Sequence, residues 1–79
     1  MPEAGTATVR SWRHPDKRRY YSARLERDLF GTWVVRRVWG SLDSRLGGMR
    51  CEPVASFGAG LDMLARIESR RRRRGYEAS

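Results

Sequence analysis

One tryptophan and several arginines gather around a glycine-rich stretch in the middle of this 79-residue chain. Trp39 precedes Gly40, and Arg37 lies two residues before the tryptophan. Arg45 and Arg50 follow them along the chain. Arginine forks pair with phosphate oxygens, and an indole can stack on a sugar or a base for about 1–3 kcal/mol per base. This pattern predicts one nucleic-acid-binding surface around residues 40–48, where glycine lets another backbone come close.

Each of these residues also has an ordinary structural interpretation. Trp39 could pack within the fold against Val35 or the loop that follows it, because most tryptophan surface is buried in folded proteins. Arg37 could form a cross-strand ion pair, which is worth about 0.2–1 kcal/mol. The candidate acidic partners are Glu26, Asp28 and Glu52. The pair Gly47-Gly48 lacks the Walker spacing and its terminal Lys-Ser/Thr, which favours a hairpin loop over a phosphate loop.

The longest run of charge is formed by residues 70–74, which are all arginine. On a helix these residues wrap more than one turn, so no single flat surface can use all of them. We expect Arg71, Arg73 and Arg74 to attract phosphates, with a strong dependence on salt. The alternative is a solvated helix end, where cations favour the negative end of the helix dipole.

The charge of the whole chain points in the same direction. Lys plus Arg number 17 and Asp plus Glu number 9, which gives a net charge of +8. This excess predicts a polyanionic partner, either nucleic acid, with DNA preferred, or an acidic protein surface. Lys17 is the one lysine, and arginine codon bias in a G+C-rich genome would also explain the excess.

Composition argues against several classes of protein. No apolar run approaches the ~20 residues of a membrane helix, and residues 1–7 do not resemble a signal peptide. We therefore expect a cytoplasmic protein with no membrane partner. A single cysteine, Cys51, and a single histidine, His14, exclude an internal disulfide and the usual structural zinc site. We expect no cofactor and no enzymatic activity, because neither residue has a partner placed to activate a nucleophile.

Hydrophobic periodicity predicts about four strands. Residues 9–12 favour a short strand, and from residue 18 the pattern has period two, with Tyr21, Ala23 and Leu25 on one face. Gly31 indicates a hairpin turn. Residues 32–39 form the richest β segment, in which Arg37 and Trp39 share a face. After a loop at residues 41–48, residues 49–52 alternate again.

The last element predicted is an amphipathic helix. Its apolar stripe is Phe57, Leu61, Leu64 and Ile67. Ser56 can cap its start and Gly75 can follow its end. The prediction is an α+β fold, a small antiparallel sheet with one C-terminal helix on one face. We expect a disordered lead at residues 1–8, one monomeric domain at 9–76 and a tail at 77–79.

The order and spacing of several motifs resemble the WGR domain. These motifs are Tyr20-Tyr21, Asp28-Leu29-Phe30-Gly31, Trp33, Arg37-Val38-Trp39-Gly40 and, after a basic helix end, Gly75-Tyr76. The WGR domain, an antiparallel sheet with one helix, occurs in poly(ADP-ribose) polymerases and in small bacterial proteins. The polymerase domains bind DNA near strand breaks, where the tryptophan packs on a nucleotide and the arginine contributes backbone contacts.

The resemblance places Trp39 and Gly40 on the first two positions of the Trp-Gly-Arg motif. The third position holds Ser41, and Arg45 in the same predicted loop is the cation that could replace the arginine. The leading hypothesis is a non-enzymatic module that binds DNA through phosphates and a stacking tryptophan. The alternative is a protein-docking module whose arginines meet an acidic partner.

Overall fold

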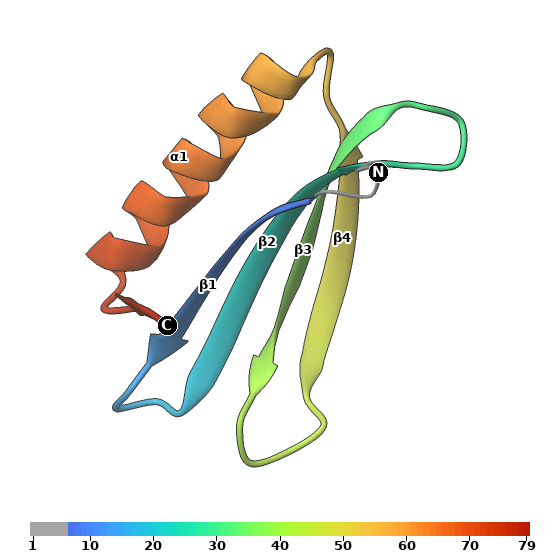
Figure 1. The fold of residues 1–79 in the computed structure, drawn as a ribbon. Coiled ribbons are helices and arrows are strands. Elements are labelled where there is room, and N and C mark those ends of the chain that lie inside the picture. The colour runs from blue at the N-terminus through green and yellow to red at the C-terminus, as the bar shows by residue number, and fades with distance from the viewer. Residues whose placement is uncertain (1–6) are drawn as a thin grey trace.

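The structure is a computed structural model that describes residues 7–79. Its elements are β1 (Thr8–His14), β2 (Arg19–Arg27), β3 (Trp33–Ser41), β4 (Gly47–Pro53), α1 (Phe57–Arg73) and β5 (Glu77–Ala78). The strands form one antiparallel sheet in the order β4-β3-β2-β1-β5, and α1 lies across one face of it (Figure 1). The predicted α+β fold is confirmed. No helix within residues 7–79 is long and apolar enough to cross a membrane.

Strand register decides which side chains face the helix. Leu25 lies opposite Val35 and Ala23 lies opposite Arg37, so these four share one face of the sheet. Tyr21, Ala23, Leu25 and Val35 are all buried there. The alternation predicted for β2 and β3 is therefore confirmed. It also fixes the place of Arg37 on the helix side of the sheet, beside an apolar core.

The core lies between the helix and the middle of the sheet. Its buried members are Trp12, Tyr21, Ala23, Leu25, Val35, Leu64 and Ile67. The helix contacts β2 and β3, and Trp12 extends the core under it from β1. Cys51 lies in β4, within the strand predicted at residues 49–52. It is exposed, because its place opposite Arg36 puts it on the face away from the helix.

The helix is rotated relative to the predicted stripe. Its buried residues are Gly60, Leu64 and Ile67, whereas Phe57 is 42% exposed and Leu61 is 38% exposed. The reason is a close approach at Gly60, where an added Cβ would collide with Leu25. The absence of a side chain at this position lets the helix axis settle onto the sheet.

Both helix ends have the predicted caps. The Ser56 hydroxyl accepts a hydrogen bond from the Ala59 amide at 3.1 Å. At the other end Gly75 has φ +90°, and the Tyr76 amide donates to the Arg71 carbonyl at 2.9 Å. With the Gly75 amide donating to the Arg72 carbonyl at 3.0 Å, this is a Schellman motif.

The Schellman turn sends the chain back to the sheet. β5 pairs with the end of β1, where Trp12 lies opposite Ala78, so residues 77–78 form a strand that sequence did not predict. The predicted loop at 41–48 is shorter than expected, because β3 continues to Ser41 and β4 starts at Gly47. A disordered lead was predicted at residues 1–8. Residues 1–6 of it lie outside the described residues, and Thr8 is the first residue of β1.

The first prediction concerns the core. Leu64→Asp should abolish cooperative unfolding, because Leu64 is 3% exposed and an unpaired charge there is incompatible with a stability of about 5–15 kcal/mol. Leu61→Asp is the matched control, since its carboxylate can reach water. Thermal melts followed by circular dichroism compare the two. A Leu64→Asp melt equal to that of the unmodified protein would contradict this packing.

The second prediction concerns the helix glycines. Gly60→Ala should destabilise the protein by about 1–3 kcal/mol in urea unfolding, because the new methyl group overpacks against the buried Leu25. Gly58→Ala is the control, because its Cβ would lie 3.8 Å from the nearest atom, Ser56 Oγ. That change should stabilise by about 0.5–1 kcal/mol through helix propensity. Equal gains at both positions would mean that no close approach exists.

Candidate nucleic-acid interface

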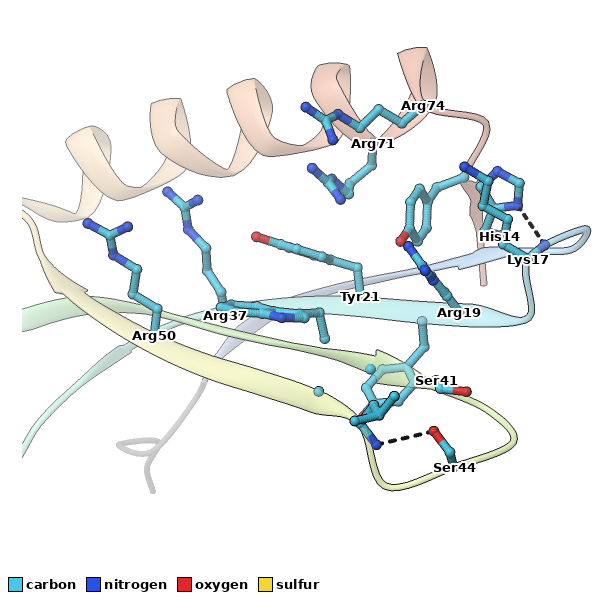
Figure 2. Close-up of a pocket in the computed structure, with 16 residues that line it drawn as sticks. His14, Lys17, Arg19, Tyr21, Arg37, Ser41, Ser44, Arg50, Arg71 and Arg74 are labelled. Carbon is cyan, nitrogen blue, oxygen red and sulfur yellow. Dashed lines mark hydrogen bonds between the residues drawn. The ribbon is translucent and has the colours of Figure 1, made fainter.

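An open groove of about 680 Å³ lies between the C-terminal half of α1 and strands β3 and β4. Figure 2 shows the helix above it and the sheet below, with Arg37 and Arg50 rising from the strands and Arg71 pointing down from the helix. The lining residues are His14, Lys17, Arg19, Tyr20, Tyr21, Arg37, Trp39, Gly40, Ser41, Ser44, Leu46, Gly47, Arg50, Arg71, Arg74 and Tyr76.

The charges that line this groove have one sign. Six lining residues are cations, namely Lys17, Arg19, Arg37, Arg50, Arg71 and Arg74. Within residues 7–79, no Asp or Glu belongs to the lining. Because low-dielectric walls focus the field of such a cleft, an anion is attracted more strongly here than the net charge alone would suggest.

Aromatic rings form part of the same lining. The rings of Tyr21 and Trp39 are nearly parallel, at 15° and 5.9 Å between centroids. The Trp39 indole also lies over Gly48, where an added Cβ would be 2.7 Å from its Cζ2. Trp39 is half-buried, so it packs against the core and still faces the groove. The two interpretations drawn from sequence are therefore compatible at this residue.

Arg71 is held against two aromatic rings. Its Cζ lies 4.3 Å from the centroid of Tyr21 and 5.1 Å from that of Tyr76. Tyr76 owes its place to the Schellman turn, whose backbone hydrogen bond ends on the Arg71 carbonyl. Cation–π contacts of this kind contribute about 0.5–2 kcal/mol each, depending on exposure. The contacts orient Arg71 toward the groove, whereas Arg72 and Arg73 donate to Glu68 and Ser69 on their own helix.

Arg37 is ion-paired as well as groove-lining. Its Nη2 lies 2.6 Å from Glu52 Oε1, and Arg50 Nη2 lies 4.0 Å from Glu52 Oε2. The ion pair expected as an alternative for Arg37 is thus present. The contact between Arg37 and Glu52 is an ion pair without hydrogen-bond geometry, because Glu52 Oε1 has no hydrogen-bond partner within the described chain. On the opposite face, Arg36 pairs with Glu26 at 2.8 Å.

The structure brings together six of the eight predicted site residues. Trp39, Gly40, Arg37, Arg50, Arg71 and Arg74 line the groove. Arg45 lies in the β3–β4 loop and Arg73 on an exposed helix face, and neither belongs to the lining. Arg73 instead approaches its own helix, with its Nη2 donating to Ser69 Oγ at 3.3 Å. The predicted surface around residues 40–48 thus loses Arg45, and the predicted phosphate-attracting set at the helix end loses Arg73.

The glycines of this region have a packing role. A Cβ on Gly40 would lie 2.8 Å from the Tyr20 hydroxyl and 2.9 Å from the Leu46 carbonyl oxygen. A Cβ on Gly47 would collide with the Trp39 carbonyl. The space that these glycines leave open is therefore filled by the protein's own chain. The predicted approach of a phosphate to this backbone has no support in the geometry.

Sequence reasoning missed the residues at one end of the groove. His14 is buried at the end of β1, accepts a hydrogen bond from the Lys17 amide at 3.2 Å and stands edge-on to Tyr76. Arg19 begins β2 on the same face as Tyr21. Strand alternation could have found Arg19. The contact of His14 with Tyr76 depends on how the helix returns, which periodicity does not specify.

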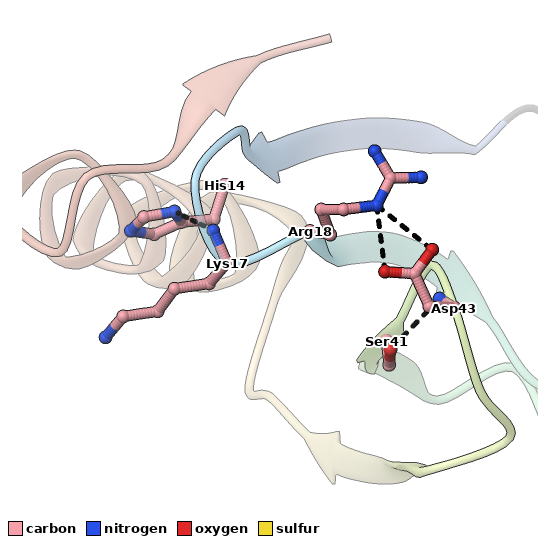
Figure 3. Close-up of polar contacts among 5 residues, drawn as sticks. All are labelled: His14, Lys17, Arg18, Ser41 and Asp43. Atoms are coloured by element: carbon pink, nitrogen blue, oxygen red, sulfur yellow. Dashed lines mark hydrogen bonds and ion pairs between the residues drawn. The ribbon is translucent and has the colours of Figure 1, made fainter.

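Two turns are joined at this end (Figure 3). Arg18 Nε donates to both carboxylate oxygens of Asp43, at 3.0 and 2.8 Å, and the Leu42 amide donates to the Arg18 carbonyl at 2.8 Å. The Asp43 hydrogen bond and charge raise the pKa of Arg18. Ser41 Oγ accepts a hydrogen bond from the Asp43 amide, so the residue in the third motif position supports this turn.

The remaining chemistry of the described residues is limited. No group of three or more His, Cys, Asp or Glu side chains within residues 7–79 could hold a metal ion. The groove is therefore defined by cations and aromatic rings. No protein-family model, curated protein or solved structure matches this chain.

Proposed function

We propose that this protein binds nucleic acid, and DNA foremost, in the groove between α1 and strands β3 and β4. One observation carries the proposal: six cations and the aromatic side chains of Tyr20, Tyr21, Trp39 and Tyr76 line one open groove that no described acidic side chain lines. A phosphodiester chain with its bases offers the matching chemistry, repeated negative charge beside flat rings. The WGR resemblance, which rests in part on the same residues, also supports a DNA partner.

The size of the groove favours an unpaired strand or a DNA end. Its volume of about 680 Å³ is within the range of pockets that enclose single small molecules, about 300–1,000 Å³. A B-form duplex, whose major groove alone is about 12 Å wide, can only lie across the opening of such a space. A nucleotide that is free of its partner can enter, with its phosphates toward the arginines and its base toward the aromatic rings.

Phosphate contacts account for most of the proposed affinity. Each phosphate that a cation neutralises releases condensed counterions, so binding weakens steeply with salt. Arg50 and Arg74 come from opposite walls of the groove and stand away from the core. Arg37 and Arg71 already have partners in Glu52 and two tyrosine rings. The net binding free energy that Arg37 and Arg71 contribute is reduced by the cost of loosening those contacts.

One observation favours docking on a protein as the second candidate. Leu29 is 100% exposed and Phe30 is 91% exposed at the β2–β3 turn. This turn is ordered by Asp28, whose Oδ1 accepts hydrogen bonds from the Phe30 and Thr32 amides at 2.9 Å. An ordered turn that presents two apolar side chains is suited to contact with a partner. It lies at the sheet end opposite the β1–β2 and β3–β4 turns.

The third prediction compares two pairs of arginines. Arg50→Gln with Arg74→Gln should weaken binding to a fluorescent single-stranded oligonucleotide and lower the salt slope by about 1.4, at about 0.7 per lost contact. Arg45→Gln with Arg73→Gln removes the same charge outside the groove and should change the slope little. Anisotropy titrations across a range of NaCl concentrations measure both. Equal losses in the two variants would assign binding to overall charge.

The fourth prediction separates stacking from charge. Trp39→Leu keeps apolar bulk over Gly48 but removes the flat ring, so it should cost about 1–3 kcal/mol of binding free energy with an unchanged salt slope. Trp33→Leu is the matched control, because Trp33 is also half-buried in β3 but lies outside the groove. The same titrations apply. Unchanged affinity in a folded Trp39→Leu variant would remove the tryptophan from the site.

A further inference from the structure

A smaller cavity lies between α1 and the sheet, next to the groove. It measures about 100 Å³ and is lined by Tyr21, Arg37, Met63, Arg66, Ile67, Arg70 and Arg71. A cavity of about 150 Å³ accommodates benzene, so this one has room for a compact ion and none for a nucleoside. Four of the residues that line this cavity are arginines, and no Asp or Glu of residues 7–79 lines it.

Two of these arginines have buried donors with nothing to bind. The Nε atoms of Arg37 and Arg71 are buried and lack a hydrogen-bond partner within residues 7–79. Figure 2 shows the two guanidinium groups approaching from opposite sides, Arg37 from the sheet and Arg71 from the helix. Leaving a buried donor without an acceptor is costly, and more so for a charged group. The geometry therefore favours an acceptor between them.

The other two arginines add charge that no acidic side chain within residues 7–79 pairs with. Arg66 and Arg70 are four residues apart on α1, a spacing at which like charges repel. Glu52 pairs with Arg37, and Arg71 contacts two aromatic rings. Four arginines thus line one cavity, and one of them is paired with a carboxylate. A multiply charged anion in the cavity would relieve this repulsion and satisfy both free Nε donors.

We propose that this cavity is a binding site for a single tetrahedral oxyanion of the phosphate class, held by Arg37, Arg66, Arg70 and Arg71. The anion is either inorganic phosphate or the phosphate of a monoester whose organic part extends into the adjoining groove. The two spaces share Tyr21, Arg37 and Arg71, which makes the second arrangement possible. The site does not depend on the proposed nucleic-acid binding, because Trp39, Arg50 and Arg74 do not line it.

The fifth prediction tests this site through stability. At constant ionic strength, replacing chloride by inorganic phosphate should raise the melting temperature in a saturable way. The rise should be about 4–8 °C at roughly four times the Kd. Ribose 5-phosphate serves as the monoester probe and sulfate as the second oxyanion. A rise with ribose 5-phosphate alone supports the monoester, and a rise with inorganic phosphate supports the free ion.

Matched variants make the outcome decisive. Arg66→Gln with Arg70→Gln should lose the rise, and both residues are exposed, so the fold should persist. Arg50→Gln with Arg74→Gln should keep the rise while losing oligonucleotide affinity, which separates this proposal from the groove. The Nε–H resonances of Arg37 and Arg71 should shift with phosphate in ¹H–¹⁵N spectra. No rise with any probe, or a rise that survives Arg66→Gln with Arg70→Gln, would overturn the proposal.

Discussion

The helix rests on the sheet through a glycine, and the rest of the structure depends on this contact. At Gly60 the helix backbone comes so close to Leu25 that a side chain has no room. This contact fixes the axial rotation of α1 and puts Leu64, Ile67 and Arg71 in line toward β2. With the helix held over the middle strands, β4 stays open on the same face. The basic groove is the space that this asymmetric placement leaves between helix and sheet.

Much of the fold follows from local patterns in the sequence. Period-two alternation assigned Tyr21, Ala23 and Leu25 to the helix face, and the turn at Gly31 has the positive φ that glycine favours. The rotation of the helix was not predicted, because the predicted stripe rested on large apolar residues and took no account of Gly60. Periodicity finds large apolar residues, but a close approach is marked by the absence of one.

The candidate site was predictable residue by residue but not as an arrangement. Alternation placed Arg37 beside Trp39, and a fork-like cation beside an indole indicated the chemistry. Arg45 and Arg50 were equivalent by sequence, yet only Arg50 lines the groove, because it lies on a strand paired opposite Arg37. Within the basic run, Arg71 and Arg74 line the groove and Arg73 does not, because successive helix residues point in different directions. The groove brings together strand residues and residues at the end of α1, which are far apart in the sequence, and local sequence patterns do not specify such tertiary contacts.

The short strand β5 allows one side of the groove to open without unfolding of the rest of the domain. It is attached by a single short ladder to β1, and it anchors Tyr76, which holds one side of Arg71. Segments with few buried contacts open locally at a free energy below that of global unfolding. Release of β5 therefore leaves Tyr76 held by the Schellman turn alone and loosens Arg71 while the four long strands stay paired. Amide exchange at the C-terminus then reports the opening of the helix side of the groove as a process distinct from unfolding of the sheet.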